Sequence, residues 1–294
     1  MTRTLTCTVP LPPNLHLPYF MAFHRRDTQE VSEAASETQI RKGMIWTGLP
    51  ACLTAQLGDT HAQATLDVDG PVAPGDAQTL EKMVRRMFGV DQPVEAFEAA
   101  YRDHPALGRL ITQQAGLRVP VAATPFEALV WAITGQQISV AAAISIRRKM
   151  ILTVGIRHAS GLYCHPDASH LAALSDSDWR QAGFSVAKVK SIRLVTDKML
   201  DGSLPLDTWA DAPPVDEIEA RLNAISGIGP WTISYTLLRG FGWLDGSLHG
   251  DVAVRRKLQM LLGSETPLDQ AQTKAWLAPF SPWRALVAAH LWAM

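Results

Sequence analysis

The stretch from Leu222 to Leu258 constrains the fold more than any other part of the chain; it reads LNAISGIGPWTISYTLLRGFGWLDGSLHGDVAVRRKL. Gly227 and Gly229 permit positive φ and a close approach of the backbone that a Cβ would block. Pro230 then opens a helix, where its missing N–H costs nothing. The first N–H groups of such a helix point outward at the positive end of its dipole and suit a phosphate. The pattern predicts a helix–hairpin–helix in which Gly227, Ile228 and Gly229 face a nucleic-acid backbone.

Three further residues of this stretch form a candidate site. Trp231 and Tyr235 are four positions apart and therefore share one face of the helix. Asp251 precedes a run of helical composition and is predicted to cap that helix, where N–H donors favour an ionised carboxylate. Two aromatic faces and a persistent anion favour a flat, positively charged guest. Taken singly, Asp251 is better interpreted as a simple N-cap, and the two aromatic residues as core.

Composition limits the class of protein. The chain has 294 residues, 47% hydrophobic and 19% charged, which indicates a globular protein long enough for two domains. Its net charge of −1 argues against a mainly electrostatic nucleic-acid binder, although backbone N–H groups need less side-chain charge. Cys7, Cys52 and Cys164 lack metal-ligand spacing, so we expect no disulfide, zinc or iron–sulfur cluster. Without a signal peptide or a membrane-spanning run, we expect a cytoplasmic monomer.

Two periodicities predict an α+β fold. Up to residue 72, alternating runs predict a small antiparallel sheet with strands 3–9, 39–46, 51–57 and 61–68, and a short apolar helix at 15–23. From Pro74 the periodicity is helical. We therefore expect a sheet domain at 1–72 and an all-helical core at 73–294, in which two lobes flank a cleft and the hairpin occupies 225–231. Its helices are expected at 76–88, 94–102, 105–114, 125–134, 139–154, 169–174, 176–182, 187–200, 215–224, 230–240, 252–262, 268–277 and 282–293.

A second informative segment, FEALVWAITGQQISV, runs from Phe126 to Val140. A helix breaks at Gly135, and Ser139 suits the cap of the next helix. The amides of Gln136 and Gln137 at this junction either reach into a duplex or the rim of a cleft, or are ordinary polar residues at a helix end. The basic runs 147–149 and 255–257 are either solvated faces or phosphate contacts.

Together these segments resemble the helix–hairpin–helix DNA glycosylases, and within them the bacterial 3-methyladenine DNA glycosylase II (AlkA) family. The resemblance covers nearly the whole chain. FEALVWAITGQQIS is similar to the segment that carries the DNA wedge, and GIGPWTISYTLLRG followed by Asp251 is similar to the hairpin and catalytic aspartate. Trp292 is similar to the tryptophan that the closing helix contributes to the base pocket. The amino-terminal strands suit this family's additional sheet domain.

The resemblance implies a base-excision repair enzyme that flips an alkylated purine out of double-stranded DNA and hydrolyses its N-glycosidic bond. A purine alkylated at N3 or N7 already carries positive charge, so the enzyme needs only an anion opposite the oxocarbenium-like sugar and a placed water. Asp251 is the implied anion, and Trp231, Tyr235 and Trp292 stack on the cationic base. Relatives that also cleave the strand have a lysine in place of Trp231, so the expected product here is an abasic site.

Three further expectations come from the resemblance alone. Gln137 or Ile138 fills the gap left by the flipped base, where the type member of the family has a leucine. Backbone carbonyls around Asn223 and Ile225 bind a monovalent cation, Na⁺ or K⁺, that bridges to phosphate. No cofactor is required for the reaction.

Alternatives to this function remain open at the level of sequence. One is a lesion-binding protein on the same scaffold without turnover, and another is an oxidised-purine glycosylase with lyase activity. The sequence does not rank 3-methyladenine, 7-methylguanine, hypoxanthine and ethenoadenine as substrates. Tyr19, Phe20 and Phe23 are the candidates for an amino-terminal contribution to the pocket.

Overall fold

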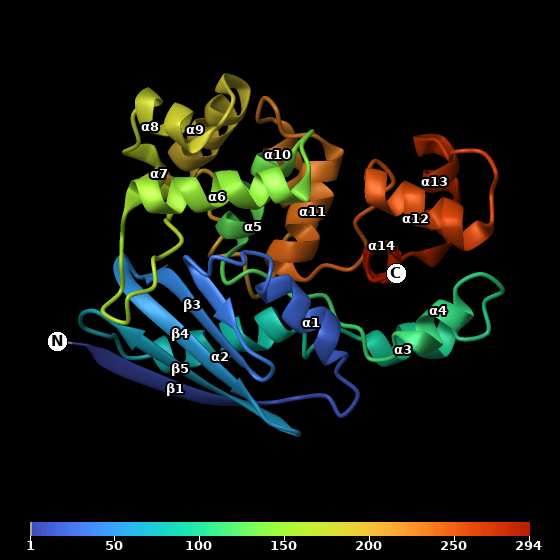
Figure 1. The fold of residues 1–294 in the computed structure, drawn as a ribbon, viewed down its shortest axis with the longest axis horizontal. Coiled ribbons are helices and arrows are strands. Elements are labelled where there is room, and N and C mark those ends of the chain that lie inside the picture. Colours follow the sequence, from blue (N-terminus) through green and yellow to red (C-terminus); the bar gives the residue numbers. More distant parts are fainter. Residues whose placement is uncertain (1) are drawn as a thin grey trace.

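An antiparallel sheet begins the chain and a long series of helices follows it (Figure 1), in a computed structural model that describes residues 2–294. The strands pair antiparallel in the order β1-β5-β4-β3-β2. Their bounds, with the helix that follows β1, are β1 (Arg3–Pro10), α1 (Leu17–His24), β2 (Glu33–Ala35), β3 (Gln39–Trp46), β4 (Leu49–Leu57) and β5 (His61–Val68).

The helical part begins with α2 and continues to the C-terminus. Most of its helices start at a capping side chain or a proline, as the sequence indicates; Thr124, Ser139 and Asp251 each accept a backbone N–H at the start of their helix. The bounds are α2 (Asp76–Phe88), α3 (Val94–Tyr101), α4 (Gly108–Gln113), α5 (Pro125–Gly135), α6 (Val140–Val154), α7 (Ala168–Ala172), α8 (Asp176–Ala182), α9 (Val186–Leu200), α10 (Val215–Asn223), α11 (Pro230–Phe241), α12 (Val252–Leu262), α13 (Gln270–Leu277), a 3₁₀ turn (Ala278–Phe280) and α14 (Arg284–Trp292).

The predicted fold class is confirmed, and the structure adds one strand and one 3₁₀ turn (Ala278–Phe280) that the pattern did not predict. Strands 39–46 and 61–68 and helices 76–88, 176–182 and 252–262 have the predicted bounds, and the other predicted elements differ by one to three residues at an end. The additional strand is β2, three residues of sequence Glu-Ala-Ala with low strand propensity. Pairing with β3 at the edge of the sheet makes it a strand, which a local pattern cannot show.

Three hydrophobic clusters form the interior. One joins the sheet to α1 and α2, and Phe20 stacks on Phe88 at its centre with ring centroids 4.7 Å apart. A second lies among α5 to α11, and the third among α3, α4 and α11 to α14. Because α2 packs on the sheet, the core of the sheet extends beyond residue 72, and the domain boundary there remains a prediction.

Helix α11 contributes to both helical clusters and is therefore the central element. Ile233 and Leu237 belong to the cluster with α5, whereas Tyr235 and Leu238 belong to the cluster with α12 and α14. A side chain at Gly240 would meet Pro125 and Ala128 of α5 at 3.0 and 3.3 Å, so the two helices approach closely there. The site residues of α11 are thus carried on a helix that is fixed from both sides.

A buried ionic network joins the sheet to the helical core. The carboxylate of Glu127 in α5 accepts hydrogen bonds from Lys42 of β3 at 2.7 Å and from Arg147 of α6 at 2.8 Å. Glu33 of β2 lies 2.5 Å from His24 and 3.4 Å from Lys42. Burial alone raises the pKa of Glu127, but Lys42, His165 and Arg147 outweigh it and hold that pKa at about 2. The network therefore contains charged carboxylates at neutral pH and fixes the end of α1 against the core.

No helix within residues 2–294 combines the length and the apolar character needed to cross a lipid bilayer.

Candidate active site

Asp251 is the N-cap of α12, and its carboxylate accepts three N–H groups. Trp231 donates its indole N–H to Oδ2 at 2.9 Å, and Trp292 donates to Oδ1 at 3.3 Å. The backbone N–H of Val254 donates to Oδ1 at 2.9 Å, which is the capping bond predicted from the sequence. Asp251 can therefore cap α12 and also serve as a functional carboxylate, because the two indole N–H groups reach its oxygens from outside the helix.

The three aromatic residues predicted for the base pocket lie together around this carboxylate. The ring centroids of Trp231 and Tyr235 are 5.3 Å apart, and those of Tyr235 and Trp292 are 6.1 Å apart. Tyr235 is 9% exposed, whereas Trp231 and Trp292 are half-buried and reach solvent. A wall of π-faces beside an anion suits a flat, electron-poor guest.

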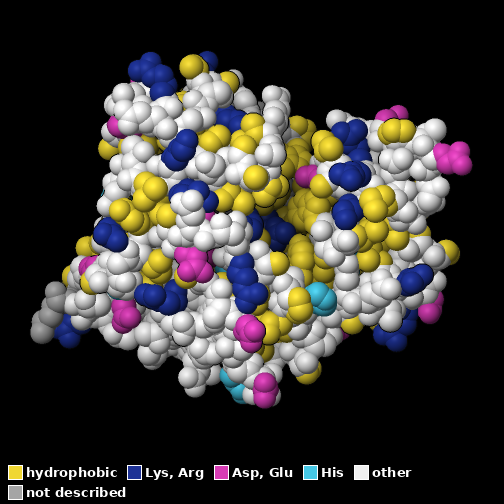
Figure 2. Space-filling model, viewed as in Figure 1, with side chains coloured by type: hydrophobic (Ala, Val, Ile, Leu, Met, Phe, Trp, Pro, Cys, Tyr) yellow, Lys and Arg dark blue, Asp and Glu magenta, His cyan; other side chains and the backbone are white. Residues whose placement is uncertain are grey.

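Figure 2 shows a deep hollow, the cleft, between the part of the molecule formed by α5 to α11 and the part formed by α12 to α14. Trp231 and Tyr235 belong to α11 of the first part, and Trp292 belongs to α14 of the second. The sides of the cleft are hydrophobic, and Lys or Arg atoms are visible at its floor.

Two arginines that the sequence prediction omitted lie against aromatic rings, and one of these rings is that of Trp292. The guanidinium carbon of Arg239 lies 5.4 Å from the Trp292 ring centre, and that of Arg26 lies 4.6 Å from the ring centre of Trp131, another half-buried aromatic residue. Arg239 had a sequence signal, because it follows Tyr235 by four positions on the same helix face.

Two of the three amino-terminal candidates reach this region. Both Tyr19 and Phe23 are half-buried and lie beneath the guanidinium of Arg239, with centroid distances of 5.9 and 4.7 Å. Tyr19 also accepts a hydrogen bond from Arg239 at 3.0 Å. Phe20 is fully buried against Phe88 in the sheet cluster, so it does not line the cleft.

The hairpin has the predicted position but only part of the predicted geometry. Gly227 has φ +86°, and a Cβ there would come within 2.2 Å of Ser191 Oγ, so glycine is required. Gly229 does not use the positive φ that glycine permits; it is extended at φ −108° and caps α11, with open space where a Cβ would lie. The Ile228 side chain is 5% exposed and packs in the core, leaving its backbone at the turn.

The junction between α5 and α6 lies against the hairpin. Gln136 donates its amide N–H to the Gly227 carbonyl and to Thr232 Oγ1, both at 2.9 Å. Gln137 and Ile138, the two candidate wedge residues, are both exposed beside it, and Gln137 has φ +58°. Positive φ in a residue other than glycine is strained, and such strain persists where neighbouring contacts impose it.

The basic run at 147–149 does not face solvent as a whole. Arg147 is 7% exposed and pairs with Glu127, and Arg148 donates to Asp27 at 2.6 Å. The expectation of a solvated face or a phosphate contact is therefore wrong for these two arginines, which hold other segments of the chain instead.

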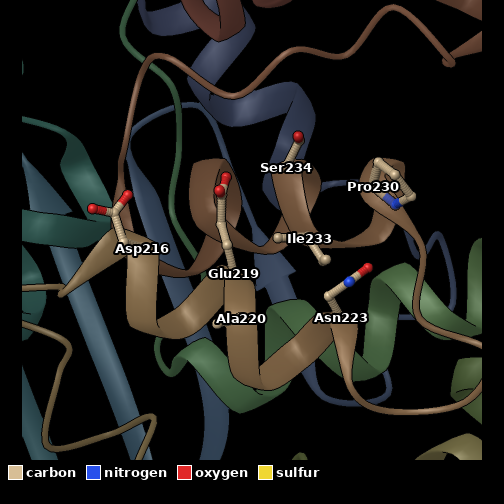
Figure 3. A pocket seen from close by; sticks show the side chains of 7 residues that line it. All are labelled: Asp216, Glu219, Ala220, Asn223, Pro230, Ile233 and Ser234. Carbon is tan, nitrogen blue, oxygen red and sulfur yellow. The ribbon is translucent and has the colours of Figure 1, made fainter.

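A groove of about 390 Å³ lies between α10 and α11, apart from Asp251 (Figure 3). Asp216, Glu219 and Asn223 of α10 face Pro230, Ile233 and Ser234 of α11 across it. Of the two residues predicted to bind a monovalent cation, Asn223 ends α10, and the Ile225 carbonyl accepts the Ile228 N–H at 3.1 Å and retains a second lone pair. Within residues 2–294, no three His, Cys, Asp or Glu side chains cluster in a way that suits a metal ion.

Comparison with known proteins gives both sequence relatives and structural neighbours. No protein-family model matches the chain. The sequence is 30% identical over 189 residues to the DNA-3-methyladenine glycosylase 2 of Escherichia coli, which covers 64% of this chain and 64% of that protein. The chain thus spans less than two thirds of that relative's length.

The solved structures extend over nearly the whole fold. A 3-methyladenine DNA glycosylase from Archaeoglobus fulgidus superimposes with a TM-score of 0.82 at 18% identity, covering 98% of this chain and 97% of that one. An 8-oxoguanine glycosylase/lyase from Clostridium acetobutylicum, in complex with double-stranded DNA, superimposes with a TM-score of 0.72 at 12% identity, covering 99% and 96%. At these identities the likeness establishes the fold.

Proposed function

We propose that this protein, which shares the fold of a 3-methyladenine DNA glycosylase and is similar in sequence to the DNA-3-methyladenine glycosylase 2 of Escherichia coli, is a helix–hairpin–helix DNA glycosylase that hydrolyses the N-glycosidic bond of alkylated purines in double-stranded DNA. The observation that carries the proposal is the Asp251 carboxylate, held by the indole N–H groups of Trp231 and Trp292 at the edge of an aromatic cleft. A single anion in such a cleft matches the requirement of a reaction whose transition state is a cationic sugar.

Asp251 acts on the sugar in this proposal. The bond between C1′ and the base breaks, its electron pair stays on the base, and positive charge develops on the sugar opposite the carboxylate. The alkylated base leaves as a neutral molecule because it was cationic in DNA. Water then adds to C1′, and the proton that this water loses passes to the solvent. The hydrogen bonds from Trp231, Trp292 and Val254 fix both oxygens before the reaction, so no reorganisation of the anion is needed at the transition state.

Trp231, Tyr235 and Trp292 bind the flipped base by stacking. An alkylated purine is electron-poor and prefers such faces. Trp231 occupies the position at which strand-cleaving relatives have a lysine, and an indole cannot form a Schiff base with the sugar. The proposed product is therefore an abasic site in an unbroken strand.

The DNA backbone binds at the hairpin in this proposal. The N–H groups that begin α11 follow Gly227 and Gly229, and the open space around Gly229 admits a phosphate. Gln137 or Ile138, exposed next to the hairpin, fills the gap left by the flipped base. We further propose that the protein acts as a monomer without a cofactor, and that carbonyls of Asn223 and Ile225 hold a Na⁺ or K⁺ ion at the hairpin.

Release of free base from methylated duplex DNA tests the proposal. We expect chromatography to show 3-methyladenine or 7-methylguanine, and we expect the strand to break only after alkali or heat. Lesion binding without released base would instead indicate a binding protein. Release of 8-oxoguanine with strand scission in the absence of alkali would instead favour an oxidised-purine glycosylase with lyase activity, against the expectation from Trp231.

A further inference from the structure

Arg26 has a guanidinium in the cleft whose donors are unused. Its guanidinium carbon lies 3.8 Å from the ring centre of Phe23 and 4.6 Å from that of Trp131. Within residues 2–294 the group makes no hydrogen bond or ion pair, although the side chain is half-buried. Five N–H donors on a rigid planar group are thus presented against an aromatic surface.

The segment that carries Arg26 is anchored on both sides. On one side the neighbouring Asp27 accepts bonds from Arg148 of α6 at 2.6 and 2.9 Å. On the other side His24, at the end of α1, lies 2.5 Å from the buried Glu33. The position of the backbone at Arg26 is therefore fixed, and only its side chain remains available for a ligand.

The surroundings of Arg26 are those of the base pocket. Burial lowers the pKa of Arg26, the charges of Tyr235 and Glu33 oppose that effect, and those of Arg147 and Arg239 add to it. The ring of Phe23, against which Arg26 lies at 3.8 Å, is also 4.7 Å from the guanidinium carbon of Arg239, and that carbon lies 5.4 Å from the Trp292 ring centre, so Arg26 lies near the aromatic wall around Asp251. The group remains positively charged at neutral pH, because the intrinsic pKa of arginine is far above it.

Arg239 differs from Arg26 in that its donors are engaged. It donates to the Pro120 carbonyl at 2.9 Å and to the Tyr19 hydroxyl at 3.0 Å, and it is 7% exposed. Arg239 therefore supports the wall of the cleft, whereas Arg26 is free to contact what enters it.

Building on the proposed function, we propose that Arg26 is a specificity-determining residue that donates hydrogen bonds to the acceptor edge of the flipped base and selects 6-oxopurines over adenine-derived bases. A guanidinium has donors only, and a 6-oxopurine whose N7 is unsubstituted, such as hypoxanthine, presents two acceptors, O6 and N7, that it can bind bidentately. An adenine-derived base presents an amino group in place of O6, so donor would face donor. A site that leaves buried polar groups unpaired when one base is bound discriminates strongly against that base.

The same contact assists release of an uncharged 6-oxopurine. When the bond from C1′ to N9 breaks, the electron pair leaves negative charge on hypoxanthine, and the guanidinium faces the atoms over which that charge spreads. Water supplies hydroxide to C1′ and its remaining proton to the departing base. We therefore expect Arg26 to matter more for hypoxanthine than for 3-methyladenine, which is already cationic in DNA.

Single-turnover excision of hypoxanthine and 3-methyladenine from matched duplexes by Arg26→Gln tests the inference. The hypoxanthine to 3-methyladenine rate ratio should fall about 5- to 150-fold, the range of a lost bidentate contact. Arg26→Lys keeps the charge without the planar fork and should give an intermediate ratio. The matched control is Arg25→Gln, because Arg25 is exposed and donates to the Ala35 and Ser36 carbonyls away from the cleft.

Three results would overturn the inference. They are an unchanged ratio in Arg26→Gln, an equal loss on both substrates, or the same shift in Arg25→Gln. If Arg26→Gln does not fold, the ratio in Arg26→Lys decides. If the parent protein releases no base, the proposed function is refuted together with the inference. If the parent protein excises both bases and the hypoxanthine to 3-methyladenine rate ratio is unchanged in Arg26→Gln, only the role of Arg26 is refuted.

Discussion

Replacing Glu127 by glutamine removes one negative charge from the buried contact between the sheet and the helical core. The side chains of Glu127, Lys42 and Arg147 are only 7%, 3% and 9% exposed, so water cannot replace the lost carboxylate. Lys42 retains Glu33 at 3.4 Å, but Arg147 retains only the Ser32 hydroxyl at 3.4 Å. Breaking a buried pair in this way costs about 3–5 kcal/mol, and the low end applies here because Lys42 keeps a carboxylate.

Urea unfolding followed by tryptophan fluorescence measures this change in the free energy of unfolding. We expect Glu127→Gln to lower the free energy of unfolding by about 3 kcal/mol. The double variant Glu127→Gln/Arg147→Met should lower it by less than the sum of the two single changes, because the unpaired charge of Arg147 is then absent. The control is Asp176→Asn, which breaks an exposed pair with Arg193 and should cost under about 1 kcal/mol. A loss from Glu127→Gln no larger than that of the control would refute the reasoning.

Three further predictions follow from single residues. Gln137→Gly should raise the free energy of unfolding by about 1 kcal/mol by relieving φ +58°, and should weaken binding to a duplex with an abasic site, measured by fluorescence anisotropy. Gly227→Ala should abolish that binding, because its Cβ would lie 2.2 Å from Ser191 Oγ; unaltered affinity would exclude the hairpin as the contact. Burial lowers the pKa of His165 to about 4, so in the parent protein only unfolded chains gain this proton between pH 6.5 and 4. Stability therefore falls as pH drops through that window, and His165→Gln should flatten the fall by up to about 3 kcal/mol; an equally steep fall in the variant would contradict this.

Much of the fold was accessible from sequence because the local signals agree. Helical periodicity predicts where the helices lie, and particular residues mark where they begin. The structure confirms Ser139 and Asp251 as N-caps and Pro230, after the glycine pair, as the first residue of α11. β2 was missed because its three residues become a strand only through the partner strand. Sequence alone does not show which of the two hairpin glycines needs its conformational freedom, because only the structure shows that Gly227 lies against another element.

Some residues of the candidate site likewise have a local sequence signal, and others do not. The pairing of Trp231 with Tyr235 follows from helical spacing, and the same spacing extends to Arg239, which periodicity could have identified. Arg26 had no local signal, because it lies in an irregular segment after α1 whose position depends on the ion pair of the neighbouring Asp27 with Arg148 of α6. The bond from Trp292 to Asp251 spans 41 positions, and only the family resemblance placed these two residues together.

Single-turnover base excision by Asp251→Asn tests the central claim most directly. Asparagine is an equally good N-cap and retains one acceptor oxygen, so the fold and the affinity for lesion DNA should persist. The account predicts that the rate of excision falls by at least about 100-fold, as expected for losing a fixed charge that faces the transition state. Asp269→Asn, which changes the exposed N-cap of α13, should leave the rate unaltered. Excision by Asp251→Asn at a rate close to that of the parent protein would contradict the account.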